Sequence, residues 1–455
     1  MTAALFTALA AEFGPRFSTS QALRDQHGGG EAWHKAAPPD AVIHVHSTEE
    51  VASILRQCHA AGVPVIPFGA GTSLEGQLGA LKGGISVDLT QMDRVLRVSA
   101  QDLDCTVQAG VTREALNTHL RDQGLFFPID PGANATLGGM AATRASGTNA
   151  VRYGTMREVV LSLKVVLPDG QIITTASRAR KSSAGYDLTR LFVGSEGTFG
   201  IITEVTLRLF GIPQAISAAV CHFDDIDAAV AAATMVTQFG IPVARMELMD
   251  RGLIRMVNAA SGLSLPEADT LAFEFHGSDA GVAEQAEQVA EIVADCGGKG
   301  FEAATDADAR NRLWKARHNA WYAVVGTRIG AKGWSSDVCV PVSELAGAVR
   351  VARDLLADCP IPAAILGHVG DGNFHVVFAL DVTDPAEIAA VKAINAGLVA
   401  HAIAVGGTCT GEHGVGTGKI GYLADEYDPA ALQLMAALKH AVDPKGIMNP
   451  GKILA

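Results

Sequence analysis

The sequence lacks the cysteine spacing and the long apolar runs that mark several protein classes. Its seven cysteines are odd in number, scattered and never spaced as Cys-x-x-Cys, which argues against disulfides, zinc knuckles and iron–sulfur clusters. Lys392, Asn395 and His401 interrupt the most apolar stretch, residues 388–405, so we expect no transmembrane segment. The first 17 residues contain Glu12 and have no basic region ahead of an apolar one. A cytoplasmic protein is expected, with peripheral contact at the inner membrane left open.

Basic and aromatic residues are also scarce. The chain has 35 Lys and Arg against 48 Asp and Glu, a net charge of −13, and only 5% aromatic residues. A field of this sign repels phosphate backbones, so no nucleic-acid partner is expected. Hydrophobic residues make up 48% of the 455 residues, and the 49 glycines exceed the usual share of ~7%. These numbers predict a globular chain of two or three domains in which clustered glycines bring backbone close to a ligand.

Short apolar runs and helical patterns alternate along two stretches of the chain. In residues 41–209 they predict an α+β region around a buried sheet. Beyond the Ile212-Pro213 step, helical patterns at 224–239 and 280–296 accompany strand patterns at 270–276, 364–369 and 374–380. A second α+β domain is therefore expected. The Asp-Pro and Asn-Pro steps within residues 443–454 predict an irregular tail.

Three glycine-rich segments lie in the first stretch. An expected strand at 63–68 precedes a loop at 69–73, whose backbone amides and hydroxyls suit a pyrophosphate. Residues 130–154 and 194–202 are small and mostly uncharged, which suits backbone packed against a large flat ligand. Residues 416–421 match Gly-x-Gly-x-x-Gly but lack a strand immediately before them. That context argues against a nicotinamide-binding Rossmann motif.

A pair of histidines flanks a turn signal in the second stretch. His368 and His375 lie on either side of Asp371-Gly372, which predicts a two-residue hairpin turn. In such a hairpin they face each other directly, with Cβ atoms ~4.5 to 5.5 Å apart, a span that suits one metal ion. In residues 409–416, glycines flank Glu412 and His413 on both sides. Glu412 is a candidate third ligand of the metal ion, and His413 is a candidate base. A His-His-Glu set leaves coordination positions open, as in catalytic sites, and suits zinc or manganese.

Two cations are candidates for binding an anionic substrate in this acidic protein. Arg317 lies on an expected helix, and its planar guanidinium matches a carboxylate in two hydrogen bonds. An arginine on a helix is by itself more often a surface residue. Lys332, in residues 331–341, is the second candidate.

The order of four motifs resembles a known family. Pro-Phe-Gly-Ala-Gly-Thr-Ser (67–73), Pro-Gly-Ala-Asn-Ala-Thr-Leu-Gly-Gly (131–139), Arg-Tyr-Gly-Thr (152–155) and Gly-Ser-Glu-Gly-Thr-Phe-Gly (194–200) are similar to the FAD-binding domain of the vanillyl-alcohol-oxidase type flavoproteins. Over nearly the whole chain, the sequence resembles the group that contains D-lactate dehydrogenases, glycolate oxidase D-subunits and D-2-hydroxyglutarate dehydrogenases. Residues 332–341 are closer to the D-lactate dehydrogenase branch.

The resemblance implies a fold class and a cofactor. The fold would be α+β with two domains: a PCMH-type FAD-binding domain at 37–215 and an α+β cap domain with an antiparallel sheet at 216–440. A helical segment at 1–36 would precede them, and a tail at 441–455 would return to the FAD domain. FAD would be non-covalent, because Ala70 stands where covalent members often carry histidine. The implied FAD contacts are Pro67, Gly69, Ala70, Gly71, Thr72, Ser73, Pro131, Gly132, Thr136, Gly138, Gly139, Ala142, Ser146, Asn149, Glu196, Gly197, Gly200, Ile202 and Asn449.

The resemblance also implies an activity. A D-2-hydroxy acid, D-lactate or one with an apolar side chain, would be oxidised to the 2-oxo acid. Arg317, Lys332 and Asn373 would bind it, and His413 would accept the hydroxyl proton while a hydride passes to FAD N5. His368, His375 and Glu412 match the family's metal ligands. The electrons would pass to an external cytochrome, electron-transfer flavoprotein or quinone.

Three alternatives stay open at this point. The chain resembles D-2-hydroxyglutarate dehydrogenases and the FAD subunit of glycolate oxidase, which works within a larger complex. A non-redox transferase on the same fold, similar to alkyl-dihydroxyacetone-phosphate synthase, is the third. A homodimer is also left open.

Overall fold

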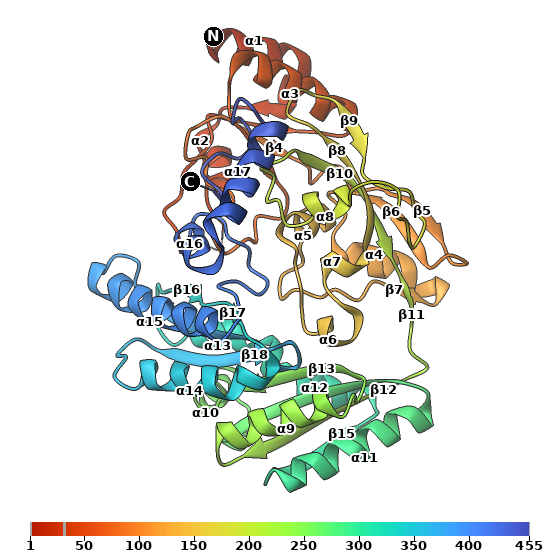
Figure 1. The fold of residues 1–455 in the computed structure, drawn as a ribbon, viewed down its shortest axis with the longest axis vertical. Helices are drawn as coiled ribbons and strands as arrows, with labels where there is room; N and C mark the ends of the chain where they lie inside the picture. Colours follow the sequence, from red (N-terminus) through yellow and green to blue (C-terminus); the bar gives the residue numbers. More distant parts are fainter. Residues whose placement is uncertain (1, 31–32, 455) are drawn as a thin grey trace. The chain divides into compact units, whose positions relative to one another are not determined.

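The computed structural model describes residues 2–30 and 33–454, which form two compact units (Figure 1). Unit 1 comprises the described residues within 1–146, 154–212 and 412–455, and unit 2 comprises residues 147–153 and 213–411. The chain thus enters unit 2 twice and returns to unit 1 for its last segment. The domain limits expected from the sequence, at residues 36, 215 and 440, stay a prediction.

The first sheet of unit 1 carries the start of the first glycine loop. Its order is β1-β2-β4-β3, with β2, β4 and β3 parallel and β1 antiparallel to β2. Helix α3 (Thr48–Ala61) connects β2 to β3; it begins where Ser47 accepts from the amide of Glu50 and ends at Gly62, whose φ is 67°. Apolar residues of α1 and α3 pack on this sheet. The bounds are α1 Thr2–Phe13, β1 Phe17–Ser18, α2 Gln21–His27, β2 Ala41–His44, β3 Val65–Phe68 and β4 Ile85–Asp88.

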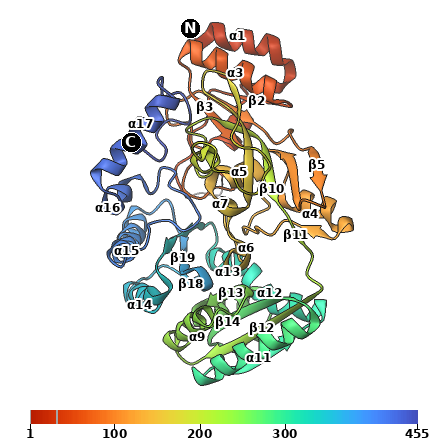
Figure 2. The same ribbon diagram turned by 45° about the vertical axis from the view of Figure 1, so that its right-hand side comes forward.

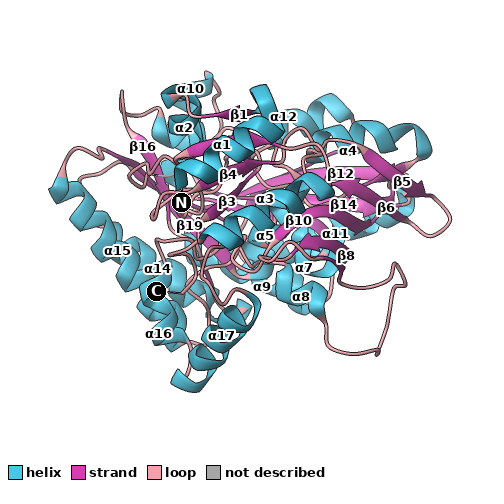
Figure 3. Cartoon of the chain, turned by 90° about the horizontal axis from the view of Figure 1, so that it is seen from above, coloured by secondary structure: helices cyan, strands magenta, loops and turns pink. Residues whose placement is uncertain are grey.

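The second sheet of unit 1 is antiparallel, in the order β5-β6-β10-β8-β9. Figure 3 labels four of its strands, β5, β6, β10 and β8. Helix α5, in the second glycine segment, packs against β10, and β10 follows the third. The last segment returns to the first sheet, where Met448 bridges to Val65 of β3. The bounds are β5 Val95–Ser99, β6 Asp104–Gln108, α4 Arg113–Leu120, β7 Leu125–Phe126, α5 Leu137–Thr143, α7 Met156–Val159, β8 Val160–Val166, β9 Ile172–Thr174, α8 Leu188–Phe192, β10 Ile201–Arg208, β11 Phe210–Gly211, α16 Leu423–Glu426 and α17 Pro429–Val442.

Unit 2 is built on an eight-stranded sheet whose neighbouring strands are antiparallel. The order is β15-β12-β14-β13-β18-β19-β16, and β17 also pairs with β19. Figure 2 shows β12, β13 and β14 with α9 and α11 beside them. The bounds are α6 Ala150–Tyr153, β12 Ala215–Phe223, α9 Ile226–Gln238, β13 Val243–Met249, α10 Arg251–Ser261, β14 Asp269–Gly277, α11 Asp279–Asp295, β15 Lys299–Ala304, α12 Ala307–His318, α13 Ala320–Val325, β16 Lys332–Ser335, β17 Val338–Cys339, α14 Leu345–Leu356, β18 Ala363–His368, β19 Asn373–Leu380 and α15 Pro385–Ala404.

One face of the unit 2 sheet is apolar at its centre and polar farther along its strands. Helices α10, α12 and α13 cover the apolar part, where Met249, Leu366 and Val377 share a cluster with Trp314. Because side chains alternate along a strand, Glu247 of β13 and His368 of β18 lie on this same face. The polar part of the face therefore begins directly beside a packed core.

Helix α15 is the one helix among residues 2–30 and 33–454 that is long and apolar enough to cross a membrane, by length and composition only. One face of the helix is buried and the other is exposed: Val391, Ile394, Leu398 and Ala402 are buried, whereas Lys392 is exposed. It packs against α14 and β19 of unit 2. This spacing of buried residues is typical of a helix that lies on a protein core.

Candidate functional site

The three predicted FAD loops meet within unit 1. A Cβ atom added to Gly69 would overlap the hydroxyl of Thr136, so the first and second loops touch there. The amide of Glu196 donates to the carbonyl of Ala142 at 2.8 Å, which joins the second and third loops. A Cβ on Gly197 would lie 2.6 Å from Pro67, at the end of β3. Close backbone approach at these glycines is the cradle that a large flat ligand needs.

Asn449 ties the last segment of the chain to these loops. Its side-chain amide donates to the carbonyl of Glu196 at 2.7 Å and to that of Gln77 at 3.2 Å. The other FAD candidates also belong to unit 1, with one exception. Asn149 belongs to unit 2, where its side chain accepts from Arg245 at 3.2 Å. The role of Asn149 in FAD binding stays a prediction.

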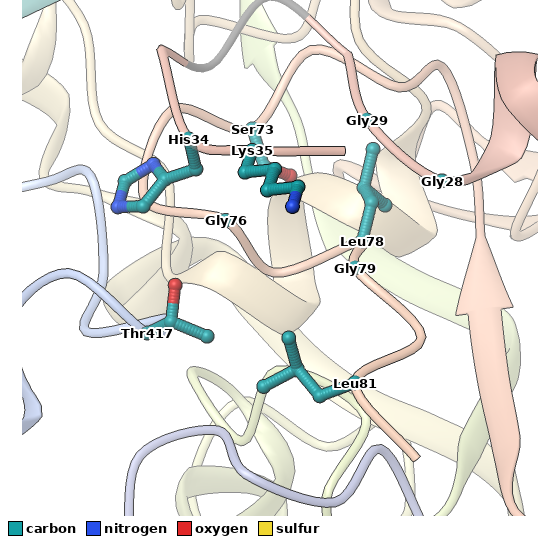
Figure 4. Close-up of a pocket in the computed structure, with 10 residues that line it drawn as sticks. All are labelled: Gly28, Gly29, His34, Lys35, Ser73, Gly76, Leu78, Gly79, Leu81 and Thr417. Carbon is teal, nitrogen blue, oxygen red and sulfur yellow. The ribbon is translucent and has the colours of Figure 1, made fainter. Parts of the chain in front are cut away.

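A small cavity of about 30 Å³ opens beside the first loop (Figure 4). Its polar side chains include Lys35, Ser73 and Thr417. Lys35 comes from the segment after α2, which the sequence analysis did not single out. An ammonium group next to Ser73 suits the negative charge of the pyrophosphate that this loop is predicted to bind.

Two buried carboxylates hold the segment that follows His413. Glu196 accepts from the amides of Val415 at 2.6 Å and Gly416 at 2.8 Å. A Cβ on Gly416 would overlap the carbonyl of Glu75, and one on Gly418 would lie 2.5 Å from the carboxylate of Glu75. Two of the three glycines in the Gly-x-Gly-x-x-Gly match, Gly416 and Gly418, therefore allow backbone to approach Glu75 and Glu196 closely.

His413 itself lies beside Glu75. Its Nδ1 is 3.8 Å from Glu75 Oε1, and its carbonyl accepts from the side chain of Gln77 at 2.8 Å. Glu75 also pairs with Lys419 at 3.2 Å, and both side chains are buried. Burial would raise the pKa of Glu75, but the charge of Lys419 and the contact with His413 outweigh it and hold that pKa below its ordinary value. Glu75 is therefore a fixed negative charge next to His413.

Glu196 behaves differently. Burial raises its pKa to about 7, although the amides of Val415 and Gly416 act in the opposite direction. Burial also lowers the pKa of Lys452 to about 8, and the charge of Glu196 opposes that change. Glu196 thus changes charge close to neutral pH.

In unit 2, the histidine hairpin has a different register from the predicted one. His368 pairs with Asn373, and His375 pairs with Leu366. The prediction that the two histidines face each other directly is wrong, because the loop has four residues: a 3-10 turn at Val369–Asp371 and then Gly372, whose φ is 77°. A shift of two residues keeps both side chains on one face as diagonal neighbours. The two rings are 5.6 Å apart between centroids and nearly perpendicular.

Both imidazoles are held through Nδ1. His368 Nδ1 lies 2.6 Å from Glu247 Oε1, and His375 Nδ1 lies 3.0 Å from the carbonyl of Ser336. A carboxylate and a carbonyl accept hydrogen bonds, so each Nδ1 is the donor, and in the neutral imidazole the lone pair then lies on Nε2. This is the arrangement in which histidine binds a metal through Nε2. The donor set therefore fits a divalent cation.

Arg317 reaches the same carboxylate. Its Nε donates to Glu247 Oε2 at 2.6 Å, and Glu247 is fully buried on β13. Burial would raise the pKa of Glu247, but the interactions of its carboxylate with His368 and Arg317 outweigh burial and hold that pKa below its ordinary value. The sequence analysis missed Glu247. Its only signal is a carboxylate inside an apolar strand pattern, Val-Ala-Arg-Met-Glu-Leu-Met.

The two other substrate-binding candidates lie in different surroundings. Asn373 is buried at the hairpin and donates to Asp337 at 2.9 Å and to the carbonyl of Val338 at 2.8 Å. Lys332 is exposed and pairs with Leu380, five residues along β19 from His375. Because alternate residues face opposite sides of a strand, Lys332 lies on the other face. The structure does not bring Lys332 to the histidines.

Glu412 follows unit 2 by a single peptide bond. The preceding residue, Gly411, lies against the hairpin, since a Cβ there would overlap the side-chain amide of Asn373. Thr410 donates to Asp337 at 2.8 Å. The chain is thus anchored to the hairpin immediately before Glu412 and His413, the predicted third ligand and base.

Comparisons with known proteins agree with this architecture. Residues 39–176 match the FAD binding domain family, and residues 212–453 match the family described as FAD linked oxidases, C-terminal domain. The chain is 50% identical to a probable mitochondrial D-lactate dehydrogenase of Danio rerio, over 96% of this chain and 88% of that protein. It is 47% identical to the mitochondrial D-lactate dehydrogenase [cytochrome] of Arabidopsis thaliana (93% and 75%) and 34% identical to glycolate oxidase subunit GlcD of Bacillus subtilis (92% and 89%).

Solved structures show the same fold at low sequence identity. p-Cresol methylhydroxylase has a TM-score of 0.82 at 17% identity, over 99% of this chain and 96% of that one. An alkyldihydroxyacetonephosphate synthase has a TM-score of 0.75 at 21% identity, over 98% and 84%. The predicted α+β, PCMH-type fold class is confirmed. The chain belongs to the FAD-linked oxidase family, as an FAD-binding oxidoreductase with D-lactate dehydrogenases among its relatives.

Proposed function

We propose that the protein oxidises a D-2-hydroxy acid, D-lactate or one with an apolar side chain, to the 2-oxo acid in an FAD-dependent reaction. Relatives named D-lactate dehydrogenase, at 50%, 47% and 42% identity over more than nine-tenths of the chain, support this activity. The observation that carries the proposal is the cluster in unit 2, where Arg317 and His368 share the buried carboxylate of Glu247. A 2-hydroxy acid carries its carboxylate and its hydroxyl group on neighbouring carbons. Its binding therefore requires a cationic side chain for the carboxylate close to a cation for the hydroxyl oxygen.

Arg317 binds the substrate carboxylate. Its Nε is used by Glu247, and the two Nη groups form the edge that pairs with a carboxylate in two hydrogen bonds. The side chain is 16% exposed, so such a pair would be largely shielded from water. Asn373 is the second proposed substrate contact, and its side chain is held in place by the bonds that Nδ2 donates to Asp337 and to the carbonyl of Val338.

His368 and His375, together with Glu412, would hold one zinc or manganese ion. When bound, the ion supplies positive charge that stabilises the substrate oxygen as the hydroxyl loses its proton. The residues of unit 2 contribute the two Nε2 atoms, whose direction is fixed by the acceptors at Nδ1. Glu412 follows the anchored Gly411 directly, which supports it as the third ligand.

His413 takes the proton of the substrate hydroxyl. Gln77 fixes its backbone, and Glu75 presents a negative charge to its ring, which stabilises the imidazolium that forms. Oxidation removes one proton and one hydride from the substrate, so the base accounts for the proton. The three loops of unit 1 would hold FAD non-covalently, and the cofactor would supply the acceptor for the hydride.

The reduced cofactor requires an external electron acceptor. The relatives from Arabidopsis thaliana and Saccharomyces cerevisiae are named as D-lactate dehydrogenases of the cytochrome type, which supports a cytochrome as the acceptor. An electron-transfer flavoprotein or a quinone is the alternative. A cytoplasmic location with peripheral contact at the inner membrane, and a homodimer, stay predictions.

A second candidate is an FAD subunit of a glycolate oxidase complex, which the 34% identity to GlcD of Bacillus subtilis favours. Such a subunit would need partner chains for turnover. A D-2-hydroxyglutarate dehydrogenase would need a further cation for the second carboxylate, and Lys332 lies away from the histidines.

The test is anaerobic bleaching of the flavin absorbance in the purified, FAD-loaded chain. D- and L-lactate, D-2-hydroxybutyrate, glycolate and D-2-hydroxyglutarate would be compared, followed by turnover with cytochrome c or an artificial dye. We expect fast bleaching by D-lactate and D-2-hydroxybutyrate and none by L-lactate. Bleaching by glycolate alone, without turnover by the single chain, would favour the subunit. No bleaching by any 2-hydroxy acid would reject the proposal.

A further inference from the structure

Glu247 is a fully buried carboxylate whose two oxygens serve two different residues. Oε1 accepts from His368 Nδ1 and Oε2 from Arg317 Nε, each at 2.6 Å. The three residues come from β13, β18 and α12, elements that are far apart in sequence. Side-chain exposure is 0% for Glu247, 8% for His368 and 16% for Arg317. Short hydrogen bonds to an ionised carboxylate that is shielded from water have strongly defined geometry.

The carboxylate constrains each partner in a specific way. An ionised carboxylate only accepts hydrogen bonds, so His368 must carry a proton on Nδ1, and the neutral imidazole then has its lone pair on Nε2. The same carboxylate fixes Arg317 at Nε and so sets the direction of its Nη edge. One side chain therefore determines both the tautomer of the first histidine and the orientation of the arginine.

We infer that Glu247 is a positioning residue that couples cation binding at His368 to substrate-carboxylate binding at Arg317. This inference rests on the proposed function and adds a residue to it that the family motifs in the sequence did not reveal. Its distinctive consequence is that one substitution weakens the affinity for the ion and the affinity for the hydroxy acid together.

The substitution Glu247→Gln tests whether both partners depend on the carboxylate, because glutamine has nearly the same shape as glutamate but only one acceptor oxygen. If the amide oxygen faces Arg317, the NH₂ group faces His368, which must then accept at Nδ1 and carry its proton on Nε2. If the amide is flipped, His368 keeps its tautomer but two donors face each other at Arg317. Glu247→Gln therefore satisfies one partner at a time, whereas Glu247→Asp keeps two acceptor oxygens and the charge.

The same sheet supplies a matched control. Glu274, on the neighbouring strand β14, is also a buried carboxylate between a histidine and an arginine, His276 at 2.9 Å and Arg245 at 3.4 Å. Its ion pairs are with His276 and Arg245, neither of which is a proposed ion ligand or the proposed carboxylate clamp. Glu274→Gln repeats the chemical change, the burial and the type of partners without touching the proposed ion ligands or the clamp.

The experiment titrates Mn²⁺ alone into chelator-treated, FAD-loaded protein and follows free Mn²⁺ by electron paramagnetic resonance. Substitution of residues that orient metal ligands typically weakens affinity by about 10- to 100-fold, and we expect that loss in Glu247→Gln. The KM for D-lactate, measured at saturating Mn²⁺, should rise about tenfold or more in the same variant. Glu247→Asp should recover part of both losses, and Glu274→Gln should bind Mn²⁺ within about twofold of wild type.

The outcomes separate this inference from the proposed function. A Glu247→Gln protein with wild-type Mn²⁺ affinity, or an equal loss in Glu274→Gln, overturns the inference while D-lactate bleaching of wild type leaves the function intact. Wild-type protein that binds no Mn²⁺ overturns both the cation site and the inference. Flavin absorbance and a thermal melt establish that each variant is folded, and if Glu247→Gln does not fold, Glu247→Asp decides by its own Mn²⁺ affinity and KM.

Discussion

Glu75 and Lys419 form an ion pair of 3.2 Å in which both side chains are almost completely buried. The two residues lie far apart in sequence, one after the first glycine loop and the other after His413. Because Glu75 Oε1 also lies 3.8 Å from His413 Nδ1, the ion pair holds a negative charge against the proposed base. Removing one partner leaves an uncompensated buried charge, which is costly in free energy.

The first prediction concerns this pair. Glu75→Gln should lower the free energy of unfolding by about 3 to 5 kcal/mol, because Lys419 loses its counter-ion. It should also lower kcat for the hydroxy acid by about tenfold, because His413 loses a charge that stabilises its protonated form. Urea unfolding and stopped-flow bleaching measure the two effects.

The double variant Glu75→Gln/Lys419→Met serves as the control for stability. It removes both charges, so we expect most of the lost stability to return while kcat stays low. If the rate recovered together with stability, Glu75 would act only on folding and not on His413.

A second prediction follows from the raised pKa of Glu196, which is about 7 against an ordinary value of 4.5. The folded protein holds this proton more tightly than the unfolded chain, so the stabilisation is fully present below pH 4.5 and is lost as the pH rises through about 7. A shift of this size corresponds to about 3 kcal/mol. Glu196→Gln, which stays neutral, should show a smaller fall in Tm than wild type between pH 5 and pH 8. Parallel Tm curves for the two proteins would contradict the prediction.

The third prediction tests the cradle of unit 1. Gly69→Ala places a methyl group where it overlaps the hydroxyl of Thr136, so the first two loops must separate. We expect the purified variant to retain less FAD and to lose it faster on dilution, as measured by the ratio of flavin to protein absorbance. Gly211→Ala is the control, because a Cβ there meets no atom within 4 Å. Equal FAD retention in the two variants would show that this contact does not shape the cradle.

Local sequence patterns were sufficient for the α+β class, whereas the PCMH-type fold followed from the resemblance of the glycine motifs to a known family. Glycines at fixed offsets after a strand, as in residues 67–73, depend only on neighbouring residues, and these segments do converge in unit 1. The hairpin register was wrong because Asp371-Gly372 is compatible with more than one loop length. In the structure, a Cβ on Gly372 would overlap the carbonyl of Val340, a contact made by another segment. Sequence alone does not show such a neighbour.

Residues that act through distant partners could not be predicted. Glu247 contacts Arg317, 70 residues away, and His368, 121 residues away. The carboxylate of Glu75 likewise contacts His413 and Lys419, in the last segment of the chain. Each is a lone carboxylate in an apolar or glycine-rich stretch, and only the pairing of strands and loops reveals its partners.

The fourth prediction concerns the hairpin histidines. His368→Ala and His375→Ala should each release the metal and reduce turnover together, since each removes one Nε2 ligand. Metal content by inductively coupled plasma mass spectrometry and steady-state turnover provide the two measurements. His222→Ala is the control, because His222 lies on β12 of the same sheet and contacts Thr270. Full turnover in a metal-free His368→Ala protein would remove the ion from the mechanism.

The last prediction isolates the base. His413→Asn removes the imidazole but keeps the backbone carbonyl that accepts from Gln77, so the loop should stay in place. The variant should remain yellow and bind Mn²⁺ as wild type does, because neither the FAD loops nor the hairpin is altered. Loss of a general base typically costs about 10² to 10⁴ in rate, so bleaching by D-lactate should slow by that factor. His440→Asn, an exposed residue of α17, is the matched control. If both variants bleached at the wild-type rate, another group would have to accept the hydroxyl proton, and Glu75 would be the next candidate to test.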